Sequence, residues 1–388
     1  MSADYWNSTQ RTQWQFTRAS LLEARRKIIF LERKMIQNGL IKDYPNIIYD
    51  YNMRIYLHNL LLKLGRRLNV RQIALATAEI YLTRFLTRVS LKEINIYLLI
   101  TTCLYVSCKI EECPQHIRLI ISEARNIWPE YIPHDATKLA EFEFYLIEEM
   151  ELYLFLHHPY KSLIQFKEYF ELNFDKYGFK LTDEEFQNSW SLINDSYITD
   201  LHLLLPPHII AVASIYITIV LKKNLSHTRN KTNGNNVTST NDPTTNANIN
   251  NSYNDKQDSK DLNIDELMNL SKTSDQNDLG VTDTNDTSPQ TKQLLQQQSQ
   301  LSSNSNQNSN DQDTKSSSSN DIVNFDLDIL DEDTIKINKF MNFLEHSHIN
   351  LDEVVEAVRD MMNVYVLWNR YNEQIVKKAL SNMLLKRM

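Results

Sequence analysis

Residues 98–114 read LLITTCLYVSCKIEECP. The first part of this stretch is apolar or small at every position, and it ends in a charged run with Lys109, Glu111 and Glu112 before Pro114. A helix that is apolar on all sides is buried among other helices. At about 1.5 Å per residue this one is too short to cross a membrane. The stretch therefore predicts the central helix of a helical bundle, with a charged rim where the helix emerges.

Composition favours an all-helical protein over the commonest nucleotide-binding enzymes. The 388 residues are 42% hydrophobic, which is enough for two packed domains. They include only five glycines, too few for Gly-rich phosphate loops or for the turns of an all-β chain. The net charge of −8 argues against nucleic-acid binding as the main activity, without excluding a local basic patch.

The cysteines Cys103, Cys108 and Cys113 give neither a disulfide framework nor a metal site. Their regular spacing turns successive side chains by about 140° around a helix, so they do not converge. We interpret them as small buried residues in a reducing compartment. The first residues, MSADYWNSTQ, contain no apolar signal core, and no apolar run reaches membrane-spanning length. We expect an intracellular soluble protein.

The first part of the chain predicts a polar arm followed by helices. Trp6, Trp14 and Phe16 lie in the arm, and we expect them to dock on the protein body or on a partner. Ser90, with Glu93 three residues later, predicts a capping box for the central helix. An N-terminal arm and helix at residues 1–44 and a first five-helix unit at residues 45–156 follow from this pattern.

A second unit begins at residue 157, where residues 157–159 mark a boundary, and it repeats the design of the first. When Leu98 is placed against Ile209, the later run HIIAVASIYITIVLKK aligns with the central stretch. Lys109 then falls opposite Val220, so its charge is a property of the first unit alone.

Residues 223–323 differ from the rest of the chain, because Asn, Ser, Thr, Gln and Asp dominate them. Such a segment buries too little apolar surface to offset its chain entropy, so we predict a disordered insertion. A folded domain tolerates it, since the cost of closing a loop rises slowly with length. The second unit is then residues 157–222 together with residues 324–388, which end in a basic helix.

These features resemble a cyclin, and within that family the C-type cyclin of the Mediator kinase module. The resemblance covers residues 1–222 and 325–375. It implies an all-α fold of two tandem five-helix cyclin boxes, with an N-terminal helix and a long insertion in the second box. The segments that carry it are ADYWNSTQRTQW, RQIALATAEIYLTRF, SLKEINIYLLITTCLYVSCKIEE, EFEFYLIEEM, HHPYKSL and NDSYITDLHLLLPPHIIA.

The resemblance implies a nuclear, non-catalytic protein without cofactor or metal. A C-type cyclin packs against the regulatory helix of a cyclin-dependent kinase, which can then form its Lys–Glu pair and Mg²⁺ site. The implied partners are the Mediator kinase and other subunits of its module, with no direct nucleic-acid or membrane contact. The implied outcome is repression or activation of RNA polymerase II transcription, through phosphorylation of the polymerase C-terminal domain and of transcription factors.

The family's kinase contact pair maps onto Lys109 in SCKIEE and Glu141 in LAEFEF, and we place Glu112 and Tyr145 beside it. A Lys and a Glu there can bind exposed kinase backbone groups while restraining each other. The alternative for Lys109 is a cation that stabilises a helix C-terminus, worth about 0.3–1 kcal/mol. The alternative for Glu141 is a solvated helix face.

The resemblance implies a second site at Trp190, Asn194, Asp195 and Tyr365, where C-type cyclins have a groove for the module subunit that activates the kinase. A Trp beside polar residues is equally consistent with half-buried packing, and both interpretations stay open. The run MRIYL at residues 53–57 partly matches the Met-Arg-Ala-Ile-Leu substrate-docking patch of cell-cycle cyclins. Its third and fourth residues differ, so we expect core packing there.

Two other functions fit this sequence less well. A TFIIB-like general transcription factor also has two cyclin-like folds and binds DNA, but it would carry a zinc ribbon with paired CxxC motifs and a strongly basic face, which this sequence lacks. An all-helical enzyme would need a metal site or a nucleophile–base pair. The acidic residues 331–333 lie at the edge of the insertion and fit a solvated entry to a helix better.

Overall fold

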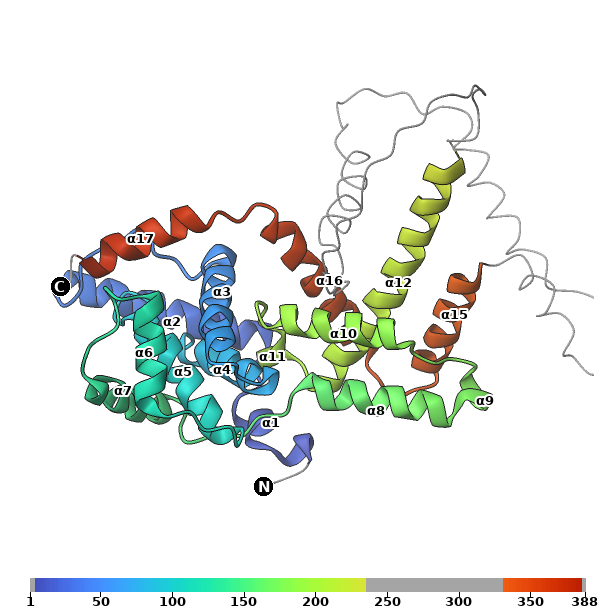
Figure 1. Ribbon diagram of the computed structural model, residues 1–388, viewed down its shortest axis with the longest axis horizontal. Helices are drawn as coiled ribbons and strands as arrows, with labels where there is room; N and C mark the ends of the chain where they lie inside the picture. The colour runs from blue at the N-terminus through green and yellow to red at the C-terminus, as the bar shows by residue number, and fades with distance from the viewer. Residues whose placement is uncertain (1–3, 235–330, 386–388) are drawn as a thin grey trace, which may run out of the picture. The chain divides into compact units, whose positions relative to one another are not determined.

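The computed structural model describes residues 4–234 and 331–385, and the regular elements in these ranges are helices (Figure 1). This confirms the predicted all-α fold with two successive groups of five main helices. An N-terminal part contains η1 (Tyr5–Asn7), α1 (Thr9–Gln13) and α2 (Arg18–Gln37). The first repeat contains α3 (Tyr51–Arg67), α4 (Gln72–Phe85), α5 (Ile96–Ile110), α6 (Ile117–Ile127) and α7 (Ala136–Glu149). The rest contains α8 (Pro159–Leu172), α9 (Phe174–Tyr177), α10 (Asp183–Ser196), α11 (Leu201–Leu204), α12 (Pro207–Gly234), α15 (Glu332–Glu345), α16 (Leu351–Trp368) and α17 (Glu373–Leu385).

Helix α5 is the buried centre of the first repeat, as its sequence predicted. It packs against α3, α4, α6 and α7, and nearly every side chain from Ile96 to Cys108 is buried. The predicted cap was wrong. The Asn95 side chain caps α5 by accepting hydrogen bonds from the N–H groups of Tyr97 and Leu98. Ser90 and Glu93 instead close a turn before the helix, where the core buries the neighbouring Leu91 and Ile94.

Helix α12 occupies the equivalent place in the second repeat. It packs against α8, α10 and α16, and it is buried from Ile209 to Ile215. This agrees with the internal repeat seen in the sequence. The helix continues to Gly234, past the end expected near residue 222. Most of the predicted insertion at residues 223–323 lies outside the described residues.

The C-terminal helix α17 was assigned by sequence to the second repeat, but it packs on the first. Its apolar side chains Val376, Leu380, Met383 and Leu384 are buried in the core formed by α3 to α7. It contacts α3, and the Tyr131 hydroxyl donates a hydrogen bond to Ser381. The apolar face of α17 is thus buried on the first repeat, which the order of the elements in the sequence does not reveal.

The N-terminal arm docks on the protein body, as its aromatic residues suggested. Trp14 is 2% exposed and lies in the core of the first repeat. The Phe16 N–H donates to the Leu203 carbonyl of the second repeat, at 2.8 Å. The arm therefore joins both repeats.

Candidate functional site

The charged rim of α5 is tied to α7 by an ion pair. Lys109 Nζ lies 2.6 Å from Glu143 Oε1 and 4.3 Å from the centre of the Tyr105 ring. Burial works to lower the Lys109 pKa, but the Glu143 carboxylate outweighs it, and the pKa is raised. The Lys109 side chain is 41% exposed and that of Glu143 13%. The ammonium is thus held in one place on a side chain that stays partly open to solvent.

The prediction that Lys109 and Glu141 restrain each other is wrong, because Lys109 pairs with Glu143 instead. Glu141 accepts from Lys138 on its own helix at 2.8 Å, and its side chain is 63% exposed. Positions 141 and 143 are separated by about 200° around a helix, so only one can face α5. The LAEFEF motif holds both glutamates, and the core packing of α7 selects Glu143.

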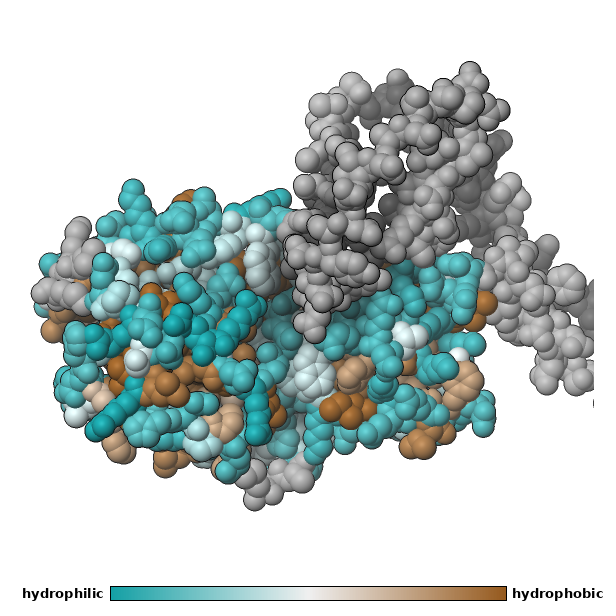
Figure 2. Space-filling model, in the orientation of Figure 1, coloured by the Kyte–Doolittle hydropathy of each residue, from teal (hydrophilic) through white to brown (hydrophobic). Residues whose placement is uncertain are grey.

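Glu112 and Tyr145 lie on the same two elements as this pair. Glu112 is exposed in the turn that ends α5, with a left-handed φ of 52°. Tyr145 is half-buried with its ring edge against Phe85, and burial raises its pKa to about 12. Large apolar side chains are exposed nearby in sequence, at Leu119 on α6 and Phe144 on α7. Figure 2 shows hydrophobic residues gathered on the surface of the first repeat, in the region where Figure 1 places α6.

Tyr160 holds two residues of the second predicted site, Trp190 and Asn194, in place. The Tyr160 ring stacks on Trp190 with centroids 4.5 Å apart, and its hydroxyl donates to Asn194 Oδ1 at 2.7 Å. The Tyr365 hydroxyl donates to Asp195 Oδ2 at 2.7 Å, and burial raises the Asp195 pKa. All four predicted residues, which we call the Trp190 surface, are engaged within the protein. This packing is compatible with either interpretation made from the sequence.

Comparison with known proteins decides the family. The family described as "Cyclin, N-terminal domain" matches residues 25–155. A Candida albicans protein named "RNA polymerase II holoenzyme cyclin-like subunit" is 65% identical, over the whole of both chains. A Scheffersomyces stipitis protein of the same name is 65% identical over 100% of this chain and 99% of its own. The chain belongs to the family of RNA polymerase II holoenzyme cyclin-like subunits.

More distant relatives of this cyclin carry the same name. The Saccharomyces cerevisiae protein is 52% identical over 56% of this chain and 74% of its own. Among solved structures, the CAK complex from Chaetomium thermophilum bound to ATP-gamma-S matches 59% of this chain and 75% of its own, with 19% identity and a TM-score of 0.47. The yeast TFIIK (Kin28/Ccl1/Tfb3) complex matches with 21% identity and a TM-score of 0.43, over 55% of this chain and 85% of its own.

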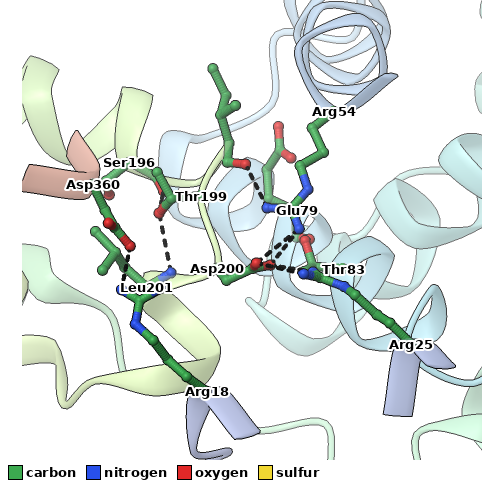
Figure 3. Close-up of polar contacts among 11 residues, drawn as sticks. Arg18, Arg25, Arg54, Glu79, Thr83, Ser196, Thr199, Asp200, Leu201 and Asp360 are labelled. Atoms are coloured by element: carbon green, nitrogen blue, oxygen red, sulfur yellow. Dashed lines mark hydrogen bonds and ion pairs between the residues drawn. The ribbon is translucent and has the colours of Figure 1, made fainter. Parts of the chain in front are cut away.

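Sequence reasoning missed the polar centre that joins the repeats of this cyclin. Asp200, before α11, lies between the guanidinium groups of Arg25 on α2 and Arg54 on α3 (Figure 3). The ion-pair distances are 2.6 and 2.8 Å. Burial alone would raise the Asp200 pKa, but the two guanidiniums hold it below its usual value. Arg18 of α2 also pairs with Asp360 of α16, so α2 is fixed to both repeats.

Two smaller expectations concern the MRIYL run and metal binding. Residues 53–57 are at most 7% exposed, which confirms core packing rather than a docking patch. Within residues 4–234 and 331–385, no three His, Cys, Asp or Glu side chains are arranged to hold a metal ion. No helix in that part of the chain is long and apolar enough to cross a membrane.

Proposed function

We propose that this cyclin is the non-catalytic regulatory subunit of a cyclin-dependent kinase in the Mediator kinase module. It acts in the nucleus, where the kinase phosphorylates the C-terminal domain of RNA polymerase II and transcription factors, and so represses or activates transcription. The cyclin supplies no catalytic group and no cofactor. Family membership supports this proposal, together with the preformed Lys109–Glu143 pair on a partly exposed face.

The α5–α7 face has the chemistry that a kinase helix needs. Lys109 has three N–H donors, and its hydrogen bond to Glu143 uses one of them. The others can donate to backbone carbonyls at the end of a kinase helix. Phe144, which is 74% exposed, and Leu119 offer apolar area to bury. Holding that helix inward lets the kinase complete its Lys–Glu pair and order its Mg²⁺ site. Glu112, Glu141 and Tyr145 complete the proposed contact face.

We also propose that a further subunit of the module, the one that activates the kinase, binds at the Trp190 surface. Trp190 is half-buried on α10 and rigidly stacked, which suits an anchoring aromatic at an interface. Replacing Trp190 by Ala should weaken binding of that subunit while leaving kinase affinity unchanged.

Reconstitution from purified proteins tests the main proposal. The kinase is assayed on a peptide of RNA polymerase II C-terminal repeats, alone and with the full-length cyclin. We expect activity only with the cyclin, no turnover by the cyclin alone, and a loss of activity with Lys109→Glu. Equal activity with and without the cyclin would contradict the proposal. Strong DNA binding by the purified chain would favour the TFIIB-like alternative.

A further inference from the structure

A chain of buried and partly buried hydrogen bonds runs from the end of α5 into the second repeat. Thr77 Oγ1, on α4, lies 2.6 Å from Glu111 Oε1 and 2.8 Å from His158 Nε2. His158 Nδ1 lies 2.8 Å from the Tyr197 hydroxyl. Glu111 is the C-cap of α5, His158 the N-cap of α8, and Tyr197 the C-cap of α10. We call these four residues the relay.

One carboxylate sets the direction of every hydrogen bond in the relay. An ionised Glu111 can only accept, so Thr77 donates its single hydroxyl proton to it. Thr77 must then accept from the Nε2–H of His158. His158 is buried, and this burial lowers its pKa to about 3, so the ring is neutral and its Nδ1 accepts from Tyr197. Each bond therefore depends on the one before it.

The second-repeat end of the relay is firmly placed. The Tyr197 ring stacks on His202 with centroids 3.8 Å apart, and it is 4% exposed. It also lies against Tyr160, the residue that holds Trp190 and Asn194.

The first-repeat end carries the proposed contact face. Glu111 lies between Lys109 and the left-handed Glu112. The turn around it is closed by two backbone hydrogen bonds, from the Glu111 N–H to the Ser107 carbonyl and from the Cys113 N–H to the Cys108 carbonyl. Fixing the Glu111 side chain therefore fixes the turn that presents Lys109 and Glu112.

We propose that Thr77, His158 and Tyr197 are positioning residues that hold the kinase-facing end of α5 from the second repeat. The expected effect on kinase binding rests on the function proposed above. The effect on the α5 turn does not, and it can be measured on the cyclin alone.

Amide hydrogen exchange of the purified full-length cyclin tests the relay. Thr77→Val and Tyr197→Phe each remove one hydroxyl and keep the shape of the side chain. We expect the Glu111 and Cys113 amides to exchange about tenfold or more faster in Thr77→Val, which loses a hydrogen bond to a charged carboxylate, and about 3–10-fold faster in Tyr197→Phe, which loses a neutral one. Thr77→Ser keeps the hydroxyl and should restore slow exchange. The matched controls are Thr83→Val on the same helix, whose hydroxyl donates to the Glu79 carbonyl, and Tyr177→Phe, whose hydroxyl is exposed.

Kinase affinity is measured with the same variants. We expect Thr77→Val and Tyr197→Phe each to weaken it by about fivefold or more, and the double variant to be no worse than the singles, because one chain is broken only once. Unchanged exchange in the α5 turn, or faster exchange spread evenly over the molecule, would overturn the relay. Faster amide exchange in the α5 turn with unchanged kinase affinity would show that the relay has no role in kinase binding. Failure of the wild-type cyclin to bind any kinase would refute the proposed function, while the exchange result would still stand.

Discussion

Lys109 on α5 and Glu143 on α7 form an ion pair of 2.6 Å at the edge of the first repeat. The pair links the end of the buried helix α5 to α7, the last helix of the first repeat. It is partly exposed, so its own contribution to folding is modest, below about 1 kcal/mol. Its main consequence is that the direction of the Lys109 ammonium is fixed.

Neutralising Glu143 should therefore affect binding more than stability. We expect Glu143→Gln to weaken kinase affinity by about tenfold, equal to about 1.4 kcal/mol, and to change the free energy of unfolding by less than about 1 kcal/mol. Glu148→Gln is the matched control, since Glu148 is exposed on the same helix and lies outside the proposed contact face. Titration calorimetry and urea denaturation give the two quantities. If Glu141→Gln weakened kinase affinity more than Glu143→Gln does, Glu141 would be the more important contact residue, as the sequence predicted.

Removing the charge of Asp200 should be costly for the fold. Asp200→Asn leaves Arg54, which is 7% exposed, as a buried cation without its carboxylate. Breaking such a pair costs about 3–5 kcal/mol. Asp183→Asn is the control, because its side chain is 95% exposed and should matter by less than about 1 kcal/mol. Equal urea midpoints for the two variants would show that Asp200 does not hold α2 and the repeats together.

A second buried carboxylate, Glu185 on α10, bridges two helices that are far apart in sequence. It lies 3.1 Å from Lys222 of α12 and 2.6 Å from Lys336 of α15 and is 1% exposed. We expect Glu185→Gln to destabilise the protein by about 3 kcal/mol, and the exposed neighbour Glu184→Gln to have little effect.

The Glu185 contribution should also depend on pH. Burial acts to raise its pKa, but Lys336 and the Thr182 N–H outweigh it, and the pKa is lowered. Its stabilisation is thus present above the unfolded pKa of 4.5 and disappears as the pH falls through the lower folded value. The stability difference between wild type and Glu185→Gln should shrink on acidification, and a difference independent of pH would contradict this.

His158 should make the protein sensitive to mild acid. Burial lowers its pKa from 6.5 to about 3, so below pH 6.5 the unfolded chain binds a proton that the folded chain does not. Stability is then lost as the pH falls, by about 1.4 kcal/mol per unit. His158→Gln removes this pH dependence. The variant should therefore be less stable than wild type at pH 7.5 and about as stable as wild type at pH 5. If the free energies of unfolding of wild type and His158→Gln differed by the same amount at every pH, His158 would titrate normally.

The sequence was sufficient to predict the helices and the order of the two repeats. The unbroken apolar run of α5 has one physical solution, burial on all sides, and the run in α12 repeats it. The capping box at Thr182 and Glu185 is also local, and it would be visible from residue types at a fixed spacing.

What the sequence could not predict depends on tertiary packing. Two glutamates in LAEFEF have the same chemistry, and only the direction in which α7 packs decides between Glu141 and Glu143. The helix α17 has an apolar face that fits either repeat until the core is assembled. Asp200 and Arg54 are far apart in sequence, and nothing local to either residue marks the other as its partner.

The most direct test of the cyclin account is a pull-down from nuclear extract with this chain as bait, with kinase activity read on an RNA polymerase II C-terminal peptide. The wild-type chain and a Lys109→Glu/Glu143→Lys variant are compared. The account predicts that wild type recovers an active kinase with Mediator subunits, and that the variant, which reverses the charges presented to the kinase, recovers at most about a tenth of the activity. Equal recovery by both chains, or no kinase with either, would contradict it.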